Sequence, residues 1–326
     1  MIQSIAQDRT PAWYQARSTG IGASEAAAAC GVSRYETTLD LWAKKVGRRN
    51  VEATPVMELG SRMELPVFQR VNQTFQIAQP SPGMFRHPEI DCVLASPDGF
   101  LSDGRGLETK VTTERNQDVD GDADSLPIEW LCQCQQQIAV TGVPSVLVAV
   151  VVLPPEVREW MLAVLGPVVT AHSLAQGLDN GKIEIRYFDV PRHSKSIDAI
   201  LSRDVDVWNH VQTQTPPPVD WTHARAAESV RDTFRDILDL GAFKHLPEAI
   251  QARWESEYEA NGKVIAEAEK VRKRIMAEAM LEIGDAAGGI LPSGGLLKKI
   301  CVGETFVDAH TKASYSYLRK VKGPKK

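Results

Sequence analysis

The amino-acid sequence predicts an α/β fold followed by an extension with a long helix and a β-hairpin. Three features indicate this. Helical spacing of apolar residues in the first 75 residues gives way, from Met84 on, to the alternation typical of strands. The β-branched run VPSVLVAVVVLP is typical of a strand covered on both faces. The Pro-rich segment TPPPVDWT then separates a core, residues 1–215, from an extension, residues 216–326.

The composition is that of a folded protein with a weak negative charge. Hydrophobic residues make up 43% and charged residues 24%, which excludes a fully disordered chain. The net charge of −5 gives no overall sign of nucleic-acid binding. The longest apolar run, residues 143–155, is too short to cross a bilayer, so no membrane association is expected. The five scattered cysteines lack zinc or disulfide spacing and predict a cytoplasmic location.

Helices are expected in the first part of the chain. Ser24 is expected to be the N-cap, and Gly31 the C-cap, of a first helix. Apolar residues recur at helical spacing over residues 38–46 and again over residues 56–75. The second of these helices carries Glu64.

A β-hairpin is expected next. The run CVLAS ends in the turn Pro97-Asp98-Gly99 and is expected to pair with GLETKVT across the turn SDGRG. The later expected elements are helix 127–141, strand 143–155, strand 183–190, helix 195–212, a long packing or oligomerisation helix over 247–283, paired strands at 296–302 and 314–321, and a basic tail from Thr311.

The segment SPDGFLSDGRGLETK brings acidic and basic side chains together. Strand geometry points Glu108 and Lys110 to the same face, and the turn brings Asp98 alongside. Two carboxylates and the backbone carbonyl of Thr109 are hard oxygen ligands of the kind that Mg²⁺ prefers. A bound Mg²⁺ can activate water, and Lys110 could stabilise the developing charge. An ordinary surface hairpin with a Glu–Lys pair would show the same local pattern.

Motifs on either side of this segment carry a family resemblance. They are the opening WYQARSTGIGASEAAAACGVSRYETTLDLWAKKVG, the helix ELGSRMELPVF and the helix WLCQCQQQIAVTG. Together with Pro97-Asp98 and Glu108-Thr109-Lys110, they make the chain resemble the PD-(D/E)XK nuclease superfamily. More narrowly, it resembles the lambda exonuclease and YqaJ viral recombinase family of phage-type alkaline exonucleases. The resemblance spans roughly residues 10–155.

The resemblance implies a fold and an activity. The fold is a restriction-endonuclease-like core, in which helices flank a central mixed sheet. The activity is that of an exonuclease dependent on Mg²⁺, with Mn²⁺ able to substitute. It degrades one strand of linear double-stranded DNA, 5′ to 3′, from 5′-phosphorylated ends. The 3′ single strand that is left serves phage-type recombination by strand annealing, and the resemblance implies a homotrimer ring and a single-strand annealing protein as partner.

The resemblance also implies roles for individual residues. Asp98 and Glu108 match the metal-binding carboxylates, Lys110 the catalytic lysine, and Glu64 the helix glutamate that supports a metal or its water. The residues that match the 5′-phosphate pocket are Arg17, Ser24, Ser96 and Gln133.

Two of these phosphate-binding roles also have a physical rationale. A helix that begins at Ser24 would present free N–H groups to an anion, and Arg17 can bind phosphate through two nitrogens. Among the glutamines at 133, 135, 136 and 137, Gln133 is favoured because it follows Trp130 by three residues.

Two other functions fit the same motifs. An endonuclease of the superfamily would use the same carboxylates but cut closed circular DNA. A non-catalytic DNA-binding recombination protein would be expected to have lost Asp98, Glu108 or Lys110, and all three are present.

Overall fold

The computed structural model describes two compact units, Met1–Leu238 and Asp239–Lys326, and each is described by itself. The described residues are 3–49, 54–80, 82–113, 122–164, 167–235, 247–283, 288–290, 296–302, 305–307, 310–312 and 315–321.

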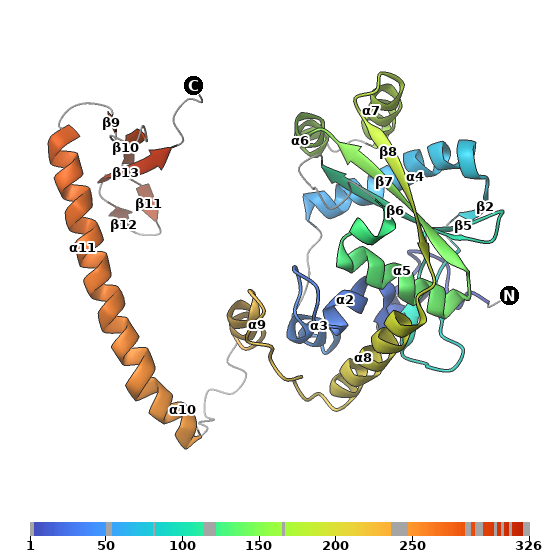
Figure 1. Ribbon diagram of the computed structural model, residues 1–326, viewed down its shortest axis with the longest axis horizontal. Coiled ribbons are helices and arrows are strands. Elements are labelled where there is room, and N and C mark those ends of the chain that lie inside the picture. The colour runs from blue at the N-terminus through green and yellow to red at the C-terminus, as the bar shows by residue number, and fades with distance from the viewer. Residues whose placement is uncertain are drawn as a thin grey trace. The chain divides into compact units, whose positions relative to one another are not determined.

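The first unit alternates helices and strands (Figure 1). In chain order its elements are α1 (Pro11–Arg17), β1 (Ile21–Gly22), the 3₁₀ turn η1 (Ala23–Glu25), α2 (Ala26–Ala29), α3 (Thr38–Lys45), α4 (Pro55–Phe75), β2 (Ile77–Pro80), β3 (Phe85–Arg86), β4 (Val93–Ala95), β5 (Gly99–Leu101), β6 (Gly106–Thr113), the 3₁₀ turn η3 (Ala123–Ser125), α5 (Ile128–Thr141), β7 (Ser145–Leu153), α6 (Pro155–Val164), α7 (Pro167–Asp179), β8 (Glu184–Pro191), α8 (Ser194–Gln212) and α9 (Ala226–Thr233).

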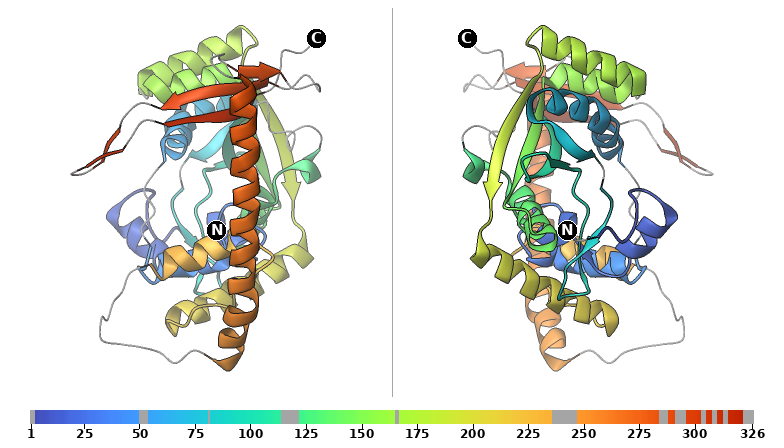
Figure 2. Two further views of the ribbon diagram at one scale, coloured as in Figure 1. Left: turned by 90° about the vertical axis from the view of Figure 1, so that its left-hand side faces the viewer. Right: turned by 90° about the vertical axis from the view of Figure 1, so that its right-hand side faces the viewer.

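The main sheet is mixed and has the strand order β2-β5-β6-β7-β8. Strands β6 and β7 run parallel, whereas the other neighbouring pairs are antiparallel. Strand β8 forms one edge and runs along the unit between α7 and α8 (Figure 2). A second, smaller sheet has the strand order β1-β4-β3. The predicted α/β class, with a central mixed sheet flanked by helices, is confirmed.

Strand β7 is the centre of the core. Every residue of this strand is buried, as the apolar run predicts. The odd-numbered residues from Leu147 to Leu153 pack on one face with α4, α6 and α7. The even-numbered residues from Val146 to Val152 pack on the other face with α5 and α8. Helices therefore cover both faces of the sheet next to β6, the strand that carries Glu108 and Lys110.

Two local predictions were wrong. The run CVLAS does not pair with β6. It forms β4, which pairs with β1 and β3, while the short strand β5 forms the hairpin with β6. Ser24 is not an N-cap, because it lies inside η1, where the carboxylate of Glu25 folds back to accept a hydrogen bond from the N–H of Gly22 at 2.9 Å.

The sequence interpretation also left α6 and α7 unassigned. Gly166 and Pro167 interrupt the helical pattern between them. The helices expected at 38–46, 56–75, 127–141 and 195–212, and the strand expected at 183–190, are present within one or two residues.

The division at residues 215/216 into core and extension stays a prediction. In the structure, α9 lies beyond that point and packs against α3. The hydroxyl of Ser229 on α9 donates to Asp40 at 2.6 Å, and the hydroxyl of Thr37 donates to Ser229 at 3.0 Å. The first unit therefore extends past the Pro-rich segment.

The second unit consists of a long helix and short strands. A helical segment runs through α10 (Glu248–Arg253), the π-helical turn η4 (Trp254–Tyr258) and α11 (Glu259–Ile283). The strands are β9 (Gly288–Ile290), β10 (Leu296–Val302), β11 (Thr305–Val307), β12 (His310–Lys312) and β13 (Tyr315–Val321). The predicted pairing of the two lysine-containing strands is confirmed, since β10 and β13 are antiparallel.

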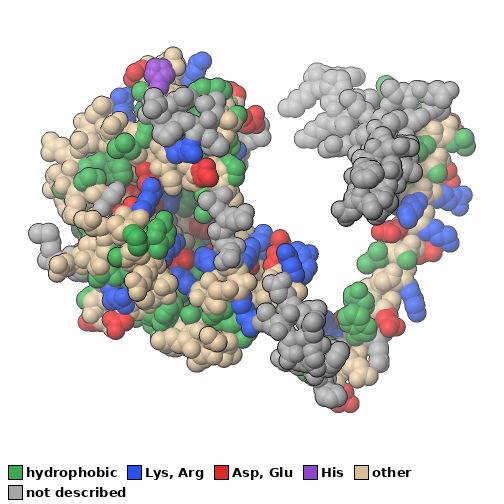
Figure 3. Space-filling model, turned by 180° about the vertical axis from the view of Figure 1, so that it is seen from behind, with side chains coloured by type: hydrophobic (Ala, Val, Ile, Leu, Met, Phe, Trp, Pro, Cys, Tyr) green, Lys and Arg blue, Asp and Glu red, His purple; other side chains and the backbone are tan. Residues whose placement is uncertain are grey.

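Helix α11 exposes apolar side chains among charged ones (Figure 3). Val264, Ile265, Val271 and Ile275 are each at least half exposed. Across the described parts of both units, no helix combines the length and apolar character that a membrane span needs.

Candidate active site

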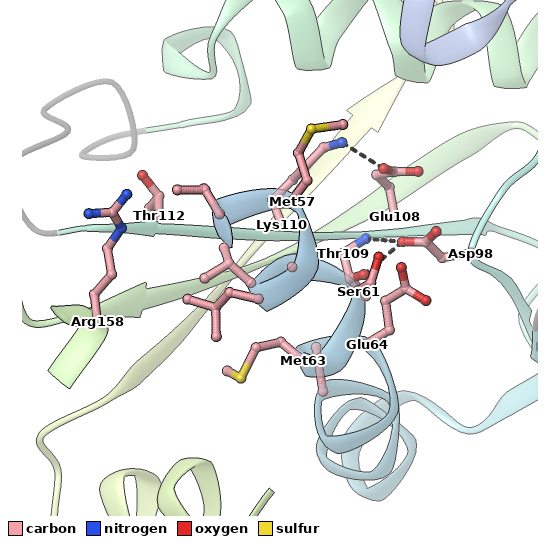
Figure 4. Close-up of a pocket in the computed structure, with 15 residues that line it drawn as sticks. Met57, Ser61, Met63, Glu64, Asp98, Glu108, Thr109, Lys110, Thr112 and Arg158 are labelled. Atoms are coloured by element: carbon pink, nitrogen blue, oxygen red, sulfur yellow. Dashed lines mark hydrogen bonds and ion pairs between the residues drawn. The ribbon is translucent and has the colours of Figure 1, made fainter. Parts of the chain in front are cut away.

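Asp98 and the first half of β6 form the centre of the candidate site (Figure 4). Asp98 lies directly before β5. Its Oδ2 accepts hydrogen bonds from the backbone N–H and from the hydroxyl of Thr109, both at 2.7 Å. These two bonds fix the carboxylate against the edge of β6.

The side chains of Glu108 and Lys110 extend from one face of β6, and that of Thr109 extends from the opposite face, as strand geometry predicts. Lys110 Nζ donates to Glu108 Oε1 at 2.7 Å and to Gln133 Oε1 at 2.8 Å. Gln133 Nε2 donates to the same Glu108 oxygen at 2.7 Å, and Gln137 Nε2 donates to Glu108 Oε2 at 2.6 Å. Glu108 is only 3% exposed, so these donors replace water around its charge.

Helix α5 supplies both glutamines because residues four apart lie on the same face of a helix. Gln133 contacts Lys110 and Glu108, and Gln137 contacts Glu108 one turn further on. Gln135 and Gln136, which lie between these two in the sequence, donate to backbone carbonyls instead. Gln135 donates to Pro191, and Gln136 donates to Ile21 and Leu94.

Burial and neighbouring charges set the protonation of this cluster. Burial, together with the negative charge of Glu108, raises the pKa of Asp98 to about 8. Burial alone would lower the pKa of Lys110, but Glu108 and Asp98 outweigh it and raise the pKa, so that Lys110 is an ammonium. With its pKa near 8, Asp98 is largely protonated at neutral pH, and a bound cation would favour its ionised form.

The donor atoms fit a hard divalent cation. In a strand, the N–H and C=O of one residue point toward the same neighbour. The N–H of Thr109 donates to Asp98. The carbonyl of Thr109 therefore points to the same side of β6 as Asp98. Within the described residues, no group of three or more His, Cys, Asp or Glu side chains is placed to hold a metal. The candidate ligands are thus the two carboxylates of Asp98 and Glu108 and the Thr109 carbonyl.

Glu64, on α4, lines the same cavity as Asp98. This cavity has a volume of about 470 Å³ and is lined by α4, by α6 and by residues 108–112 of β6. Arg9 binds both carboxylate oxygens of Glu64, at 2.6 and 2.5 Å. Burial is the main reason that the pKa of Glu64 is raised, and the charge of Arg9 opposes this.

The four predicted phosphate-binding residues line a second cavity, of about 600 Å³. Arg17, Ser24, Ser96 and Gln133 all contribute to its wall. Asp98, Glu64 and Ser61 also line it, as Glu64 and Asp98 line the first cavity. The structure therefore brings the predicted phosphate-binding residues to the same cavity as Asp98 and Glu64.

Arg17 is held by three contacts. Its Nη2 donates to the hydroxyl of Ser24 at 3.1 Å, and its guanidinium lies 5.2 Å from the centre of the Trp13 ring. It also lies 3.8 Å from the carboxylate of Glu25. Trp13 in turn donates to Ser96 at 3.2 Å, which links the two sides of the cavity.

Sequence reasoning missed two residues of the site, Arg9 and Glu25. It favoured Gln133 over Gln137, and in the structure both glutamines bind Glu108. Glu25 and Arg9 gave no local signal, because their partners at positions 44, 45 and 64 are distant in the sequence.

All the predicted site residues lie between positions 17 and 133. Residues 12–144 match the family model described as a YqaJ-like viral recombinase domain. The match covers less than half of the chain. The matched segment runs from α1 to the end of α5, includes β1 to β6, and contains every residue that the sequence assigned to catalysis or phosphate binding.

The chain is also similar to a curated protein, the uncharacterized protein YqaJ of Bacillus subtilis (strain 168). It is 25% identical over 208 residues, which are 60% of this chain and 54% of that protein. The chain thus spans about half the length of this relative.

Solved structures show a weak likeness. The alkaline exonuclease LHK-Exo from Laribacter hongkongensis is 18% identical with a TM-score of 0.45, covering 63% of this chain and 94% of that chain. A phage-related exonuclease from Haemophilus somnus 129PT is 11% identical with a TM-score of 0.37, covering 60% of this chain and 96% of that chain.

Proposed function

We propose that this chain is a metal-dependent nuclease that digests one strand of linear double-stranded DNA from the 5′ end. The observation that carries the proposal is that Asp98, Glu64 and Arg17 line the same 600 Å³ cavity. We call Asp98 and Glu64, together with Glu108 and Lys110 of the adjoining first cavity, the acidic end, and Arg17 with Ser24 the basic end. A terminal phosphate bound at the basic end would place a nearby phosphodiester at the acidic end.

The acidic end supports phosphodiester hydrolysis. Asp98, Glu108 and the Thr109 carbonyl would hold Mg²⁺ or Mn²⁺, which when bound supplies an activated water and stabilises charge on the phosphate. Gln133 and Gln137 keep the carboxylate of Glu108 in one orientation. The Lys110 ammonium lies beside that carboxylate, where it can orient the attacking water or stabilise the developing negative charge.

The basic end supports recognition of a 5′ phosphate. The guanidinium of Arg17 can bind a phosphate through two nitrogens, and its stacking on Trp13 limits its freedom. Ser24 and Gln133 add a hydroxyl and an amide donor to the same wall, which Ser96 also lines. A terminal phosphate held there favours 5′-to-3′ digestion.

The match of residues 12–144 to the YqaJ-like viral recombinase model supports a role in phage-type recombination. On the same basis we propose that the digestion leaves a 3′ single strand for a single-strand annealing protein, inside the bacterial cell. The family resemblance further supports a homotrimer that encloses the DNA.

A time course on linear and on closed circular duplex tests the activity. The proposal predicts digestion of the linear duplex only, with Mg²⁺ or Mn²⁺, and none with a chelator. Cleavage of the circle would indicate an endonuclease of the same superfamily. Binding to linear DNA without cleavage under any metal condition would indicate a non-catalytic recombination protein.

A further inference from the structure

Glu25 is a buried carboxylate that three basic side chains surround. It is 3% exposed and lies in η1 beside Ser24. Its carboxylate oxygens lie 2.7 Å from Lys45 Nζ, 3.4 Å from Lys44 Nζ and 3.8 Å from Arg17 Nη2. This cluster forms the wall behind the basic end of the 600 Å³ cavity.

The two lysines of this cluster are placed differently. The side chain of Lys45 is 6% exposed and also donates to the backbone carbonyl of Arg17 at 3.2 Å, so it supports the fold of this wall. The side chain of Lys44 is 26% exposed, and Lys44 lines the cavity with Arg17 and Ser24. Only Lys44, of these two, can reach a ligand in the cavity.

The cluster carries an excess positive charge on the cavity side. Lys44 has one further acidic partner, Glu36, whose carboxylate lies 3.0 Å from its Nζ. Three cations thus share the two carboxylates of Glu25 and Glu36. An anion at Arg17 and Ser24 would meet a second cation, Lys44, in addition to the guanidinium.

We propose that Lys44 is a specificity-determining residue that, together with Arg17, selects a doubly charged phosphate monoester over a singly charged phosphodiester. The inference rests on the proposed function, because the ligand is the terminal 5′ phosphate of the DNA substrate. It adds a residue for which the sequence motifs assign no role.

The charge of the ligand gives the physical reason. A phosphate monoester has a second pKa near ~6 and carries roughly −1.5 to −2 charges at neutral pH. An internal phosphodiester carries a single charge. Arg17 can bind either group, whereas a second cation gains more from the additional charge of the monoester.

The test compares full-length wild-type protein with Lys44→Gln on linear duplexes that end in a 5′ phosphate or a 5′ hydroxyl. We expect the variant to lose roughly tenfold of the preference for the phosphorylated end, while its rate on the hydroxyl end is kept. Lys44→Arg should restore the preference. Lys195→Gln, at an exposed position on α8 outside the cavity, is the matched control and should behave as wild type.

A pH series separates recognition of charge from a structural effect. The wild-type preference should rise between about pH 5.5 and pH 7.5 as the terminal phosphate gains its second charge. The preference of Lys44→Gln should stay nearly flat over this range. A pH profile parallel to that of the wild type, or an equal loss of rate on both ends, would overturn the inference.

A binding measurement keeps the inference separate from the nuclease proposal. Fluorescence anisotropy in chelator compares the affinities for a duplex with a 5′ phosphate and one with a 5′ hydroxyl. If the wild type binds both ends equally, the inference fails whether or not the protein cleaves DNA. If the wild type prefers the phosphorylated end and Lys44→Gln does not, the inference stands even if no cleavage is found.

Discussion

The acidic and the basic ends of the candidate site are built in different ways. The acidic end comes largely from one hairpin, in which Asp98 and Lys110 are twelve residues apart, and from one face of α5. The basic end is assembled from α1, η1, α3 and the residue Ser96, and a buried glutamate holds it together. The catalytic end is therefore a local motif, whereas the recognition end depends on tertiary packing around one charge.

This difference predicts which substitutions separate catalysis from recognition. Asp98→Ala or Lys110→Ala should reduce the digestion of linear duplex roughly 10³-fold, on phosphorylated and hydroxyl ends alike, because each removes a group at the reacting phosphate. Initial rates in Mg²⁺ measure this. Asp103→Ala, an exposed change in the same hairpin, is the control. Digestion at the wild-type rate by either variant would contradict the assignment of the acidic end.

The basic end should contribute more to stability, through Glu25. Burial alone would raise the pKa of Glu25, but Lys45, Lys44 and Arg17 outweigh burial and lower the pKa from 4.5 to about 2. A lowered pKa in the folded state gives stability that is present above pH 4.5 and is lost as the pH falls toward 2. The contribution at neutral pH is on the order of 3 kcal/mol.

Urea unfolding from pH 6 down to pH 3 measures this contribution. Glu25→Gln should unfold at lower urea than the wild type at pH 6, and the two curves should converge toward pH 3. Glu36→Gln, which removes a more exposed partner of Lys44, should lose much less. A constant difference between Glu25→Gln and wild type at all pH values would show that the charge of Glu25 is not the cause.

Arg17→Ala should affect recognition without removing the catalytic groups. We expect roughly a ten- to hundredfold loss of the preference for 5′-phosphorylated ends, because a charge-assisted hydrogen-bond donor is lost. Competition between phosphorylated and hydroxyl duplexes measures the ratio directly, with Arg203→Ala on α8 as the control. Equal slowing on both substrates would remove Arg17 from the phosphate-binding site.

The smallest expected effect concerns Arg9, which binds Glu64 at the acidic end. Arg9 neutralises Glu64. Arg9→Ala should therefore make the electrostatic potential near Asp98 more negative and increase the affinity for Mn²⁺ roughly threefold. Calorimetric titration of the DNA-free protein measures this affinity. Arg70→Ala, on α4 but outside both cavities, should not change it. Weaker binding in Arg9→Ala would mean that Arg9 positions Glu64 for the metal.

The sequence predicted the acidic end better than the basic end. Hairpin geometry depends on short-range spacing, so Asp98, Glu108 and Lys110 could be placed together from the chain alone, whereas the choice among the four glutamines of α5 stayed open. The strand β7 was predictable because its apolar run is uninterrupted. The pairing of β4 with β1 and β3 was not, because short strands of similar composition compete for the same partners.

The burial of Glu25 was beyond sequence reasoning for a different reason. Ser24 followed by Glu25 and four alanines has the pattern of a capped helix, and the N-cap interpretation accounts for the serine without a partner elsewhere. In the structure, the basic residues of α3 draw Glu25 into the core, and its carboxylate takes over the N–H of Gly22. Long-range ion pairing therefore replaced the local cap.

The position of the first cut tests the central claim most directly, namely that both ends of the candidate site act on the same DNA terminus. A linear duplex labelled at its 5′-phosphorylated end is digested in Mg²⁺ and sampled at early times. The account predicts that the label appears at once as a mononucleotide or very short product, while a label at the 3′ end stays in long strands. Early release of the 5′ label in long fragments, or of the 3′ label first, would contradict it.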